Sequence, residues 1–84
     1  MTLPGNEHRV VPKRMLPVEI QLVTGRIVKG ILHVDLDERL YDFMNREDPF
    51  IVLVNRRKSR LTTIINKHHV VAIREYESLD ELDD

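Results

Sequence analysis

The stretch from Pro17 to Gly30, PVEIQLVTGRIVKG, restricts the possible folds of this 84-residue chain more than any other. From Val18 to Leu22, apolar residues alternate with polar ones, which is the period of a strand with one buried face. Gly25 interrupts the pattern and suits a turn that needs a positive φ. Gly30 lies inside an otherwise apolar strand, where a glycine indicates a bend or a close backbone approach. Two strands joined by a tight turn, the second of them bent, predict the opening of a small, strongly curved β-barrel.

Three more strands are expected after this hairpin. Phe50 to Val54, FIVLV, is a continuous apolar run and predicts a central strand, with its phenylalanine in the core. Residues 61–65 and 69–76 are also strand-like, and Asn66 to His68 form a one-turn connection between them. Val71 and Ile73 are expected on one face of the last strand.

Between the second and third strands the periodicity changes to that of a helix. The segment from Asp37 to Asn45 places apolar residues at i, i+3 and i+4, namely Leu40, Phe43 and Met44. Asp37 is expected to cap the start of this helix. Arg39 and Asp42 are three residues apart and are expected to pair. The sequence therefore predicts a short helix whose apolar stripe covers one end of the barrel.

The charge is distributed unevenly along the chain. Residues 75–84 hold six acidic residues and no basic one, whereas residues 1–74 hold thirteen basic against eight acidic residues. We expect a single domain, residues 17–76, preceded by a flexible arm, residues 1–16, and followed by a disordered acidic tail, residues 77–84. Either the tail competes with polyanions for the basic body, or it only keeps the protein in solution.

Several classes of function are disfavoured by what the sequence lacks. There is no cysteine, and no apolar run approaches the roughly 20 residues of a membrane span, so we expect a soluble cytoplasmic protein. No nucleophile motif or glycine-rich phosphate loop is present, so we expect neither catalysis nor a cofactor. The histidines lack the spacing of metal ligands, so we expect no metal site; they are His8, His33, His68 and His69.

The order of elements is that of a small SH3-like or Sm-like barrel, and the residues resemble the Sm-like family. VEIQLVTGRIVKG is similar to the first Sm motif, most closely in the form found in bacterial Hfq-type RNA chaperones. FIVLVN, residues 50–55, looks like the third strand of that family. INKHHVVAI, residues 65–73, is similar to the second Sm motif, in which a Lys-His pair precedes the last strand. The segment from Arg39 to Asn45 also resembles an Arg-Leu-x-Asp-x-Leu/Met-Asn insert in small uncharacterised bacterial barrels. The resemblance implies a mainly β, five-stranded Sm-like barrel with a short helix between strands two and three.

Two functions follow as alternatives. In the first, the chain forms a homo-oligomer through the open edges of strands four and five, because unpaired edges invite pairing, and it binds RNA at the Lys-His turn, as the resemblance implies. The nucleic-acid-binding residues would be Lys67 and His68, with Arg56, Arg57 and Lys58 attracting phosphate from the turn after the third strand. In the second, the barrel binds a protein partner and no nucleic acid, through a surface on the inserted helix made of Arg39, Tyr41 and Asp42.

Overall fold

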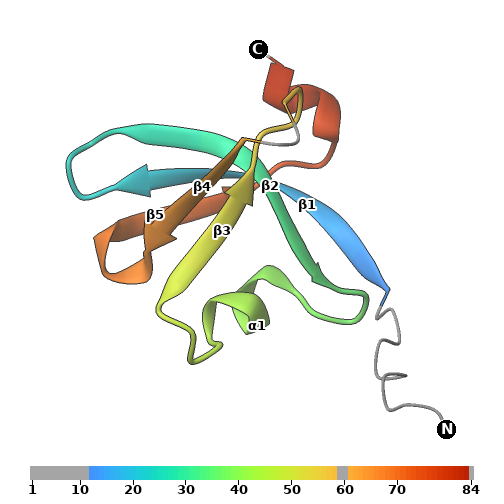
Figure 1. Ribbon diagram of the computed structural model, residues 1–84, viewed down its shortest axis with the longest axis horizontal. Coiled ribbons are helices and arrows are strands. Elements are labelled where there is room, and N and C mark those ends of the chain that lie inside the picture. Colours follow the sequence, from blue (N-terminus) through green and yellow to red (C-terminus); the bar gives the residue numbers. More distant parts are fainter. Residues whose placement is uncertain (1–11, 59–60, 84) are drawn as a thin grey trace, which may run out of the picture.

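The computed structural model describes residues 12–58 and 61–83. This part of the chain forms five antiparallel strands in one sheet, in the order β4-β3-β2-β1-β5 (Figure 1). The strands are β1 (Lys13–Leu22), β2 (Ile27–Asp35), β3 (Phe50–Val54), β4 (Thr62–Asn66) and β5 (Val70–Glu75). The helix α1 (Leu40–Met44) lies between β2 and β3, and two 3-10 turns follow, η2 (Lys67–His69) and η3 (Leu79–Asp83).

The mainly β class, the five strands and the inserted helix are confirmed, but the sheet is open where a closed barrel is expected. Strands β4 and β5 form the two edges and are not hydrogen-bonded to each other. The turn η2 carries the chain from one edge to the other in three residues, without pairing the strands that it joins. The expectation that the fourth and fifth strands lie at the edges is therefore correct.

The boundaries of the sheet differ from the expected ones at both ends. Strand β1 begins at Lys13, four residues before Pro17, because Leu16 is buried and lies opposite Leu32 of β2. Residues 13–16 thus belong to the sheet, and residues 1–11 of the expected arm lie outside the described residues. At the other end, the expected disordered tail contains the turn η3, which packs against β1.

The hairpin of β1 and β2 has the geometry that its glycines predict. Gly25 lies in the turn with a φ of 92°. Gly30 is buried opposite Val18, at the point where β2 approaches β3. The glycines therefore serve a turn and a close approach, as expected.

The core lies inside the curved sheet, and α1 covers part of it. Its buried members are Leu16, Val18, Ile20, Leu32, Val34, Phe43, Ile51, Leu53 and Ile65. From α1, Phe43 is buried, and the half-buried Leu40 and Met44 pack against the core, which confirms the predicted apolar stripe. The helix therefore packs against the core through its apolar stripe.

The start of α1 differs from the prediction. The helix begins at Leu40, and the N-cap is Arg39 rather than Asp37. The Asp42 carboxylate accepts the Arg39 backbone N–H at 3.1 Å, and it also forms the expected ion pair with that arginine. Asp37 lies in a turn closed by the Glu38 N–H and the Asp35 carbonyl, 3.0 Å apart, so it precedes the helix.

In two strands, β3 and β5, the residues that are buried differ from those that the sequence pattern predicts. In β3 only alternate residues are buried, so Phe50 and Val52 are exposed and the prediction that Phe50 lies in the core is wrong. In β5 a bulge interrupts the pairing with β1. Leu22 lies opposite Val70, whereas its neighbour Gln21 lies opposite Ala72, so that one residue of β5 has no partner in the register. The extra residue, Val71, is 60% exposed, and Val70 joins Ile73 against the core instead.

Candidate functional site

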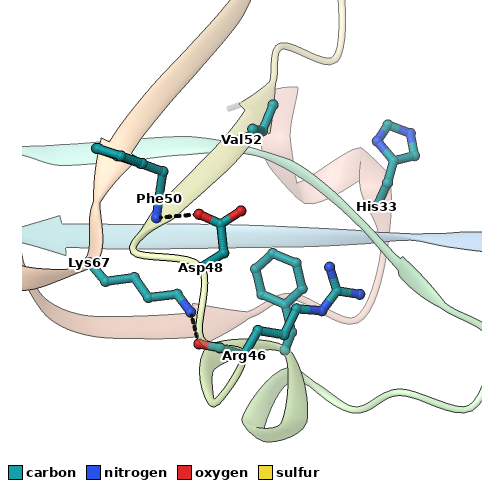
Figure 2. A pocket seen from close by; sticks show the side chains of 7 residues that line it. His33, Arg46, Asp48, Phe50, Val52 and Lys67 are labelled. Atoms are coloured by element: carbon teal, nitrogen blue, oxygen red, sulfur yellow. Dashed lines mark hydrogen bonds between the residues drawn. The ribbon is translucent and has the colours of Figure 1, made fainter.

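The turn η2 places Lys67 beside the loop that follows α1. Its ammonium donates a hydrogen bond to the carbonyl oxygen of Arg46 at 2.7 Å (Figure 2). It donates another to the carbonyl oxygen of Met44 at 3.3 Å. The Lys67 backbone N–H also donates to the Pro49 carbonyl at 2.8 Å. The lysine thus ties the end of β4 to the loop between α1 and β3.

A hollow of about 160 Å³ lies next to Lys67. It is lined by residues of β2, α1, β3, η2 and the connecting loop, namely His33, Phe43, Arg46, Asp48, Phe50, Val52 and Lys67. The Arg46 guanidinium lies over the Phe43 ring, 4.7 Å from its centroid. The Asp48 carboxylate accepts the Phe50 N–H at 3.0 Å, which holds the exposed ring of Phe50 at the start of β3. Cationic and aromatic groups therefore meet in one small depression.

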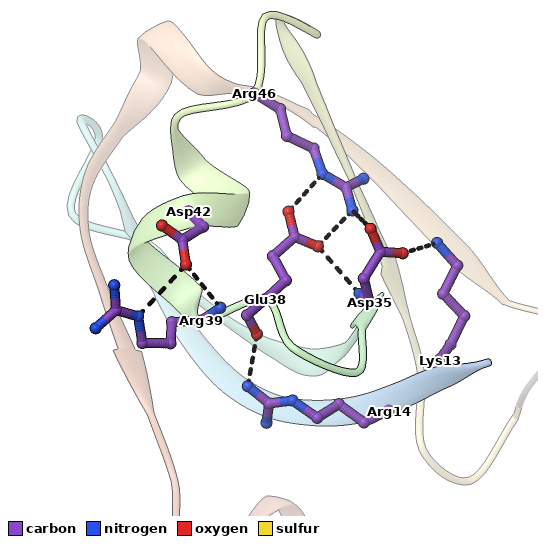
Figure 3. A network of polar contacts seen from close by, with 7 residues as sticks. All are labelled: Lys13, Arg14, Asp35, Glu38, Arg39, Asp42 and Arg46. Atoms are coloured by element: carbon purple, nitrogen blue, oxygen red, sulfur yellow. Dashed lines mark hydrogen bonds and ion pairs between the residues drawn. The ribbon is translucent and has the colours of Figure 1, made fainter. Parts of the chain in front are cut away.

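Arg46 is held in place by a network of ion pairs (Figure 3). Its guanidinium donates to both carboxylate oxygens of Glu38, at 2.8 and 2.5 Å, and lies 3.7 Å from the Asp35 carboxylate. Lys13 pairs with Asp35 at 2.7 Å, and Arg14 donates to the Glu38 carbonyl. The hydrogen bond from Arg46 lowers the pKa of Glu38, and the same bond raises the pKa of Arg46. Both groups are therefore charged at neutral pH, with the guanidinium fixed in orientation.

His68 lies in the same turn as Lys67 but does not line the hollow. Its backbone N–H donates to the Asn66 side chain at 2.9 Å, and its own side chain is exposed. The predicted one-turn connection is correct, and within it only the lysine of the Lys-His pair borders the hollow.

The expected phosphate-attracting residues lie elsewhere, in a turn that we name the basic tip, residues Asn55 to Lys58. The Asn55 side chain accepts the backbone N–H groups of Arg57, at 3.0 Å, and Lys58, at 2.8 Å, which shapes the turn. Arg56 pairs with Asp80 of η3 at 3.3 Å. In the β3–β4 pairing, Val54 lies opposite Thr62 and Phe50 opposite Asn66, so the basic tip and Lys67 are at opposite ends of these strands. They do not form one site.

The three residues of the expected interaction surface on α1 lie at the surface of the protein. Arg39 and Asp42 pair with each other, whereas Tyr41 is 75% exposed. Tyr41 borders a groove of about 410 Å³ between α1 and the edge strand β5. The other lining residues are Leu40, Met44, Lys67, Val70, Val71, Ala72 and Ile73. The groove is thus mostly apolar and runs beside an unpaired strand edge.

Sequence reasoning missed the residues that join Lys67 in the hollow. Arg46 follows Phe43 by three residues, a spacing that places a cation over a ring at the end of a helix, and this signal was available. The contribution of Phe50 was not available, because FIVLV reads as buried on both faces. His33 and Phe50 come together only through the pairing of β2 with β3.

The described residues include no cluster of three or more histidine, aspartate or glutamate side chains that would hold a metal ion. Within the same part of the chain, no helix is long and apolar enough to span a membrane. Comparison with protein-family models, with curated proteins and with solved structures finds no match to this chain.

Proposed function

We propose that this chain is a non-catalytic, Sm-like subunit that assembles with copies of itself and binds RNA at the hollow beside Lys67. The observation that carries the proposal is the meeting of Lys67 and Arg46 with Phe43 and Phe50 around one depression of about 160 Å³. Single-stranded RNA is bound by cationic groups that hold phosphate and by aromatic faces on which bases stack. In this hollow the Lys67 ammonium is placed to hold phosphate and the exposed ring of Phe50 to contact a base, whereas Phe43 is buried beneath the Arg46 guanidinium.

The size of the hollow favours one base or one phosphate at a time. Pockets that enclose drug-sized ligands measure roughly 300–1,000 Å³, and this one is smaller. An ammonium has three N–H donors, and two of those of Lys67 are directed at carbonyl oxygens. The third is left for a phosphate oxygen. His68, exposed on the same turn, extends this contact surface outward.

Assembly is supported by the two unpaired edges of the sheet. Strand β4 exposes Ile64 at 65%, and strand β5 exposes Val71 at 60% beside the apolar groove. Unpaired edges invite pairing with another chain, and two different edges on one chain give head-to-tail contacts that close into a ring or continue as a fibre. Repeated copies would present one hollow each, so that weak single contacts add along an RNA strand.

Assembly is tested by light scattering coupled to size-exclusion chromatography at micromolar concentration. The unmodified chain is expected to elute as an oligomer, and Ile64→Lys as a monomer. Met15→Lys is the matched control, because Met15 is 52% exposed and lies on β1 rather than on β4 or β5. A monomeric unmodified chain would reject assembly through the edges.

RNA binding is tested by titrating a fluorescein-labelled oligouridylate at low and high salt. Both Lys67→Ala and His68→Ala are expected to weaken binding, and Lys67→Ala is expected to reduce the salt dependence by about one phosphate contact. Arg74→Ala, which removes an equal charge from β5, is the control for general electrostatic attraction. Thermal unfolding checks that Lys67→Ala still folds, and His68→Ala tests the site if it does not. Absence of binding at low salt rejects the proposal.

A second candidate function is supported by the groove between α1 and β5. An exposed tyrosine beside an apolar groove is typical of a protein-binding surface, and an unpaired strand edge allows a partner to add a strand. In this alternative the partner is a protein and RNA is not bound. This function is favoured over the first if a protein is still captured by the chain after nuclease treatment and is no longer captured by Tyr41→Ala.

A further inference from the structure

The basic tip and the acidic end of the chain, which are more than twenty residues apart in the sequence, lie side by side. The Asp80 carboxylate pairs with the Arg56 guanidinium at 3.3 Å. Leu82 borders a hollow of about 80 Å³ whose other lining residues are Lys29, Gly30, Asn55, Arg56 and Arg57. Figure 1 shows η3 beside the connection that follows β3. The segment with the densest negative charge thus covers part of the segment with the densest positive charge.

The covering segment has a defined local structure. The Glu81 carboxylate accepts the backbone N–H groups of Glu77, at 3.0 Å, and Ser78, at 3.1 Å. The Ser78 hydroxyl accepts the Asp80 N–H at 3.1 Å. These bonds form the turn η3, which packs against β1. The position of Asp80 is therefore set by the fold as well as by attraction to Arg56.

The ion pair between this segment and the basic tip is open to solvent on its Asp80 side. The side chain of Asp80 is 86% exposed and that of Arg56 is 31% exposed. An ion pair this open to water contributes little and is screened by salt. An oligoanion that contacts several cations at once releases their counterions together, and therefore competes well for a basic segment.

We propose that η3 is a displaceable anionic cover, which occupies the basic tip in the absence of RNA and is expelled when an RNA phosphate binds Arg56. This inference rests on the proposed function, because it assumes that the chain binds RNA. The inference adds the basic tip as a second contact for RNA, at the opposite end of β3 and β4 from Lys67. Whether RNA can bind this tip then depends on the position of η3.

The experiment measures the affinity of a fluorescein-labelled twelve-nucleotide oligouridylate at low salt for four forms of the chain. They are the unmodified chain, Asp80→Asn, a form without residues 78–84, and Asp37→Asn. Asp80→Asn is expected to bind about twofold to fivefold more tightly than the unmodified chain, the range of one exposed ion pair. Removal of residues 78–84 is expected to have a larger effect in the same direction. Asp37→Asn removes an equal charge in the turn before α1 and is expected to lack the gain of Asp80→Asn.

The outcomes separate this inference from the function on which it rests. If none of the four forms binds the oligouridylate, the proposed function fails, and the cover fails with it. If all four bind with the affinity of the unmodified chain, or if Asp37→Asn matches Asp80→Asn, RNA binding stands and the cover is rejected.

A direct measurement of the segment gives an independent test. Amide resonances of residues 79–82 are expected to shift toward unstructured values when oligouridylate is added to the unmodified chain. The same addition to Arg56→Ala is expected to leave them unchanged or less changed, because the phosphate contact that expels η3 is missing. RNA binding without any change at residues 79–82 would overturn the proposal.

Discussion

Gly30 and Leu53 lie so close across the β2–β3 interface that no side chain fits between them. A Cβ atom added to Gly30 would be 2.6 Å from Leu53 Cγ and 2.9 Å from the Val54 carbonyl oxygen. The Leu53 side chain is buried at 2% exposure, and the Val54 oxygen belongs to the backbone, so neither moves freely. This contact is the physical reason for the glycine in the middle of an apolar strand.

Gly30→Ala is therefore expected to destabilise the fold by about 1–3 kcal/mol, the usual cost of forcing atoms into a packed interior. Urea unfolding measures the effect. Its cost is expected to be smaller when Leu53→Ala is already present, because that change removes one of the two clashes. Gly25→Ala is the contrast. A Cβ there meets nothing within 4 Å, but the φ of 92° is strained for alanine, so its cost should not depend on residue 53.

The bulge in β5 predicts that Val70 contributes more to the stability of the fold than Val71, whereas simple alternation along the strand predicts the reverse. Val70→Ala is expected to cost about 1 kcal/mol, because Val70 packs against the core. Val71→Ala is expected to change the free energy of unfolding by less than about 0.5 kcal/mol, because Val71 is the exposed extra residue. Urea unfolding of the two variants decides the register. A larger loss at Val71 would contradict the bulge.

The pair of Glu38 and Arg46 predicts a loss of stability in acid. Because the folded state lowers the pKa of Glu38, its contribution is fully present above the unfolded value of about 4.3 and is lost as the pH falls through the folded value. The urea midpoint is expected to fall less between pH 6 and pH 3 in Glu38→Gln than in the unmodified chain. Arg46→Gln is expected to reduce the pH dependence in the same way. An unchanged dependence in both variants would contradict the pair.

Tyr76 is expected to ionise above the usual tyrosine range. Its hydroxyl donates a hydrogen bond to Glu19, and this bond, with burial and the adjacent carboxylate, raises the pKa of Tyr76. The chain has two tyrosines, so Tyr41→Phe leaves Tyr76 as the single one for an absorbance titration. The midpoint is expected above 10, the unperturbed value, and Glu19→Gln is expected to lower it. The stabilisation from this bond is present below the unfolded pKa and lost as the pH rises through the folded one. A midpoint at or below 10 would count against the hydrogen bond.

The candidate site could be predicted only in its local part. The turn that carries Lys67 could be predicted from the polar residues between two strand-like segments. The proposal that Lys67 belongs to a binding site came from the resemblance to the Sm-like family. The spacing of Phe43 and Arg46 was a usable signal, but their position beside Lys67 and Phe50 could not be predicted, because it depends on where α1 lies and on the pairing of β3 with β4. The separation of the basic tip from Lys67 likewise depends on which ends of the strands meet.

The sequence by itself determined the elements that depend on near neighbours. Alternation, apolar runs and β-branched residues predicted the strands, i, i+3, i+4 spacing predicted the apolar stripe of α1, and Gly25 predicted the turn with positive φ. Only the tertiary structure decided that the sheet stays open, that Val70 replaces Val71 at the core, and that η3 lies against the basic tip. The reason is physical: periodicity and φ preference act over a few residues, whereas strand pairing, burial and charge contacts depend on which distant segments the folded chain brings together.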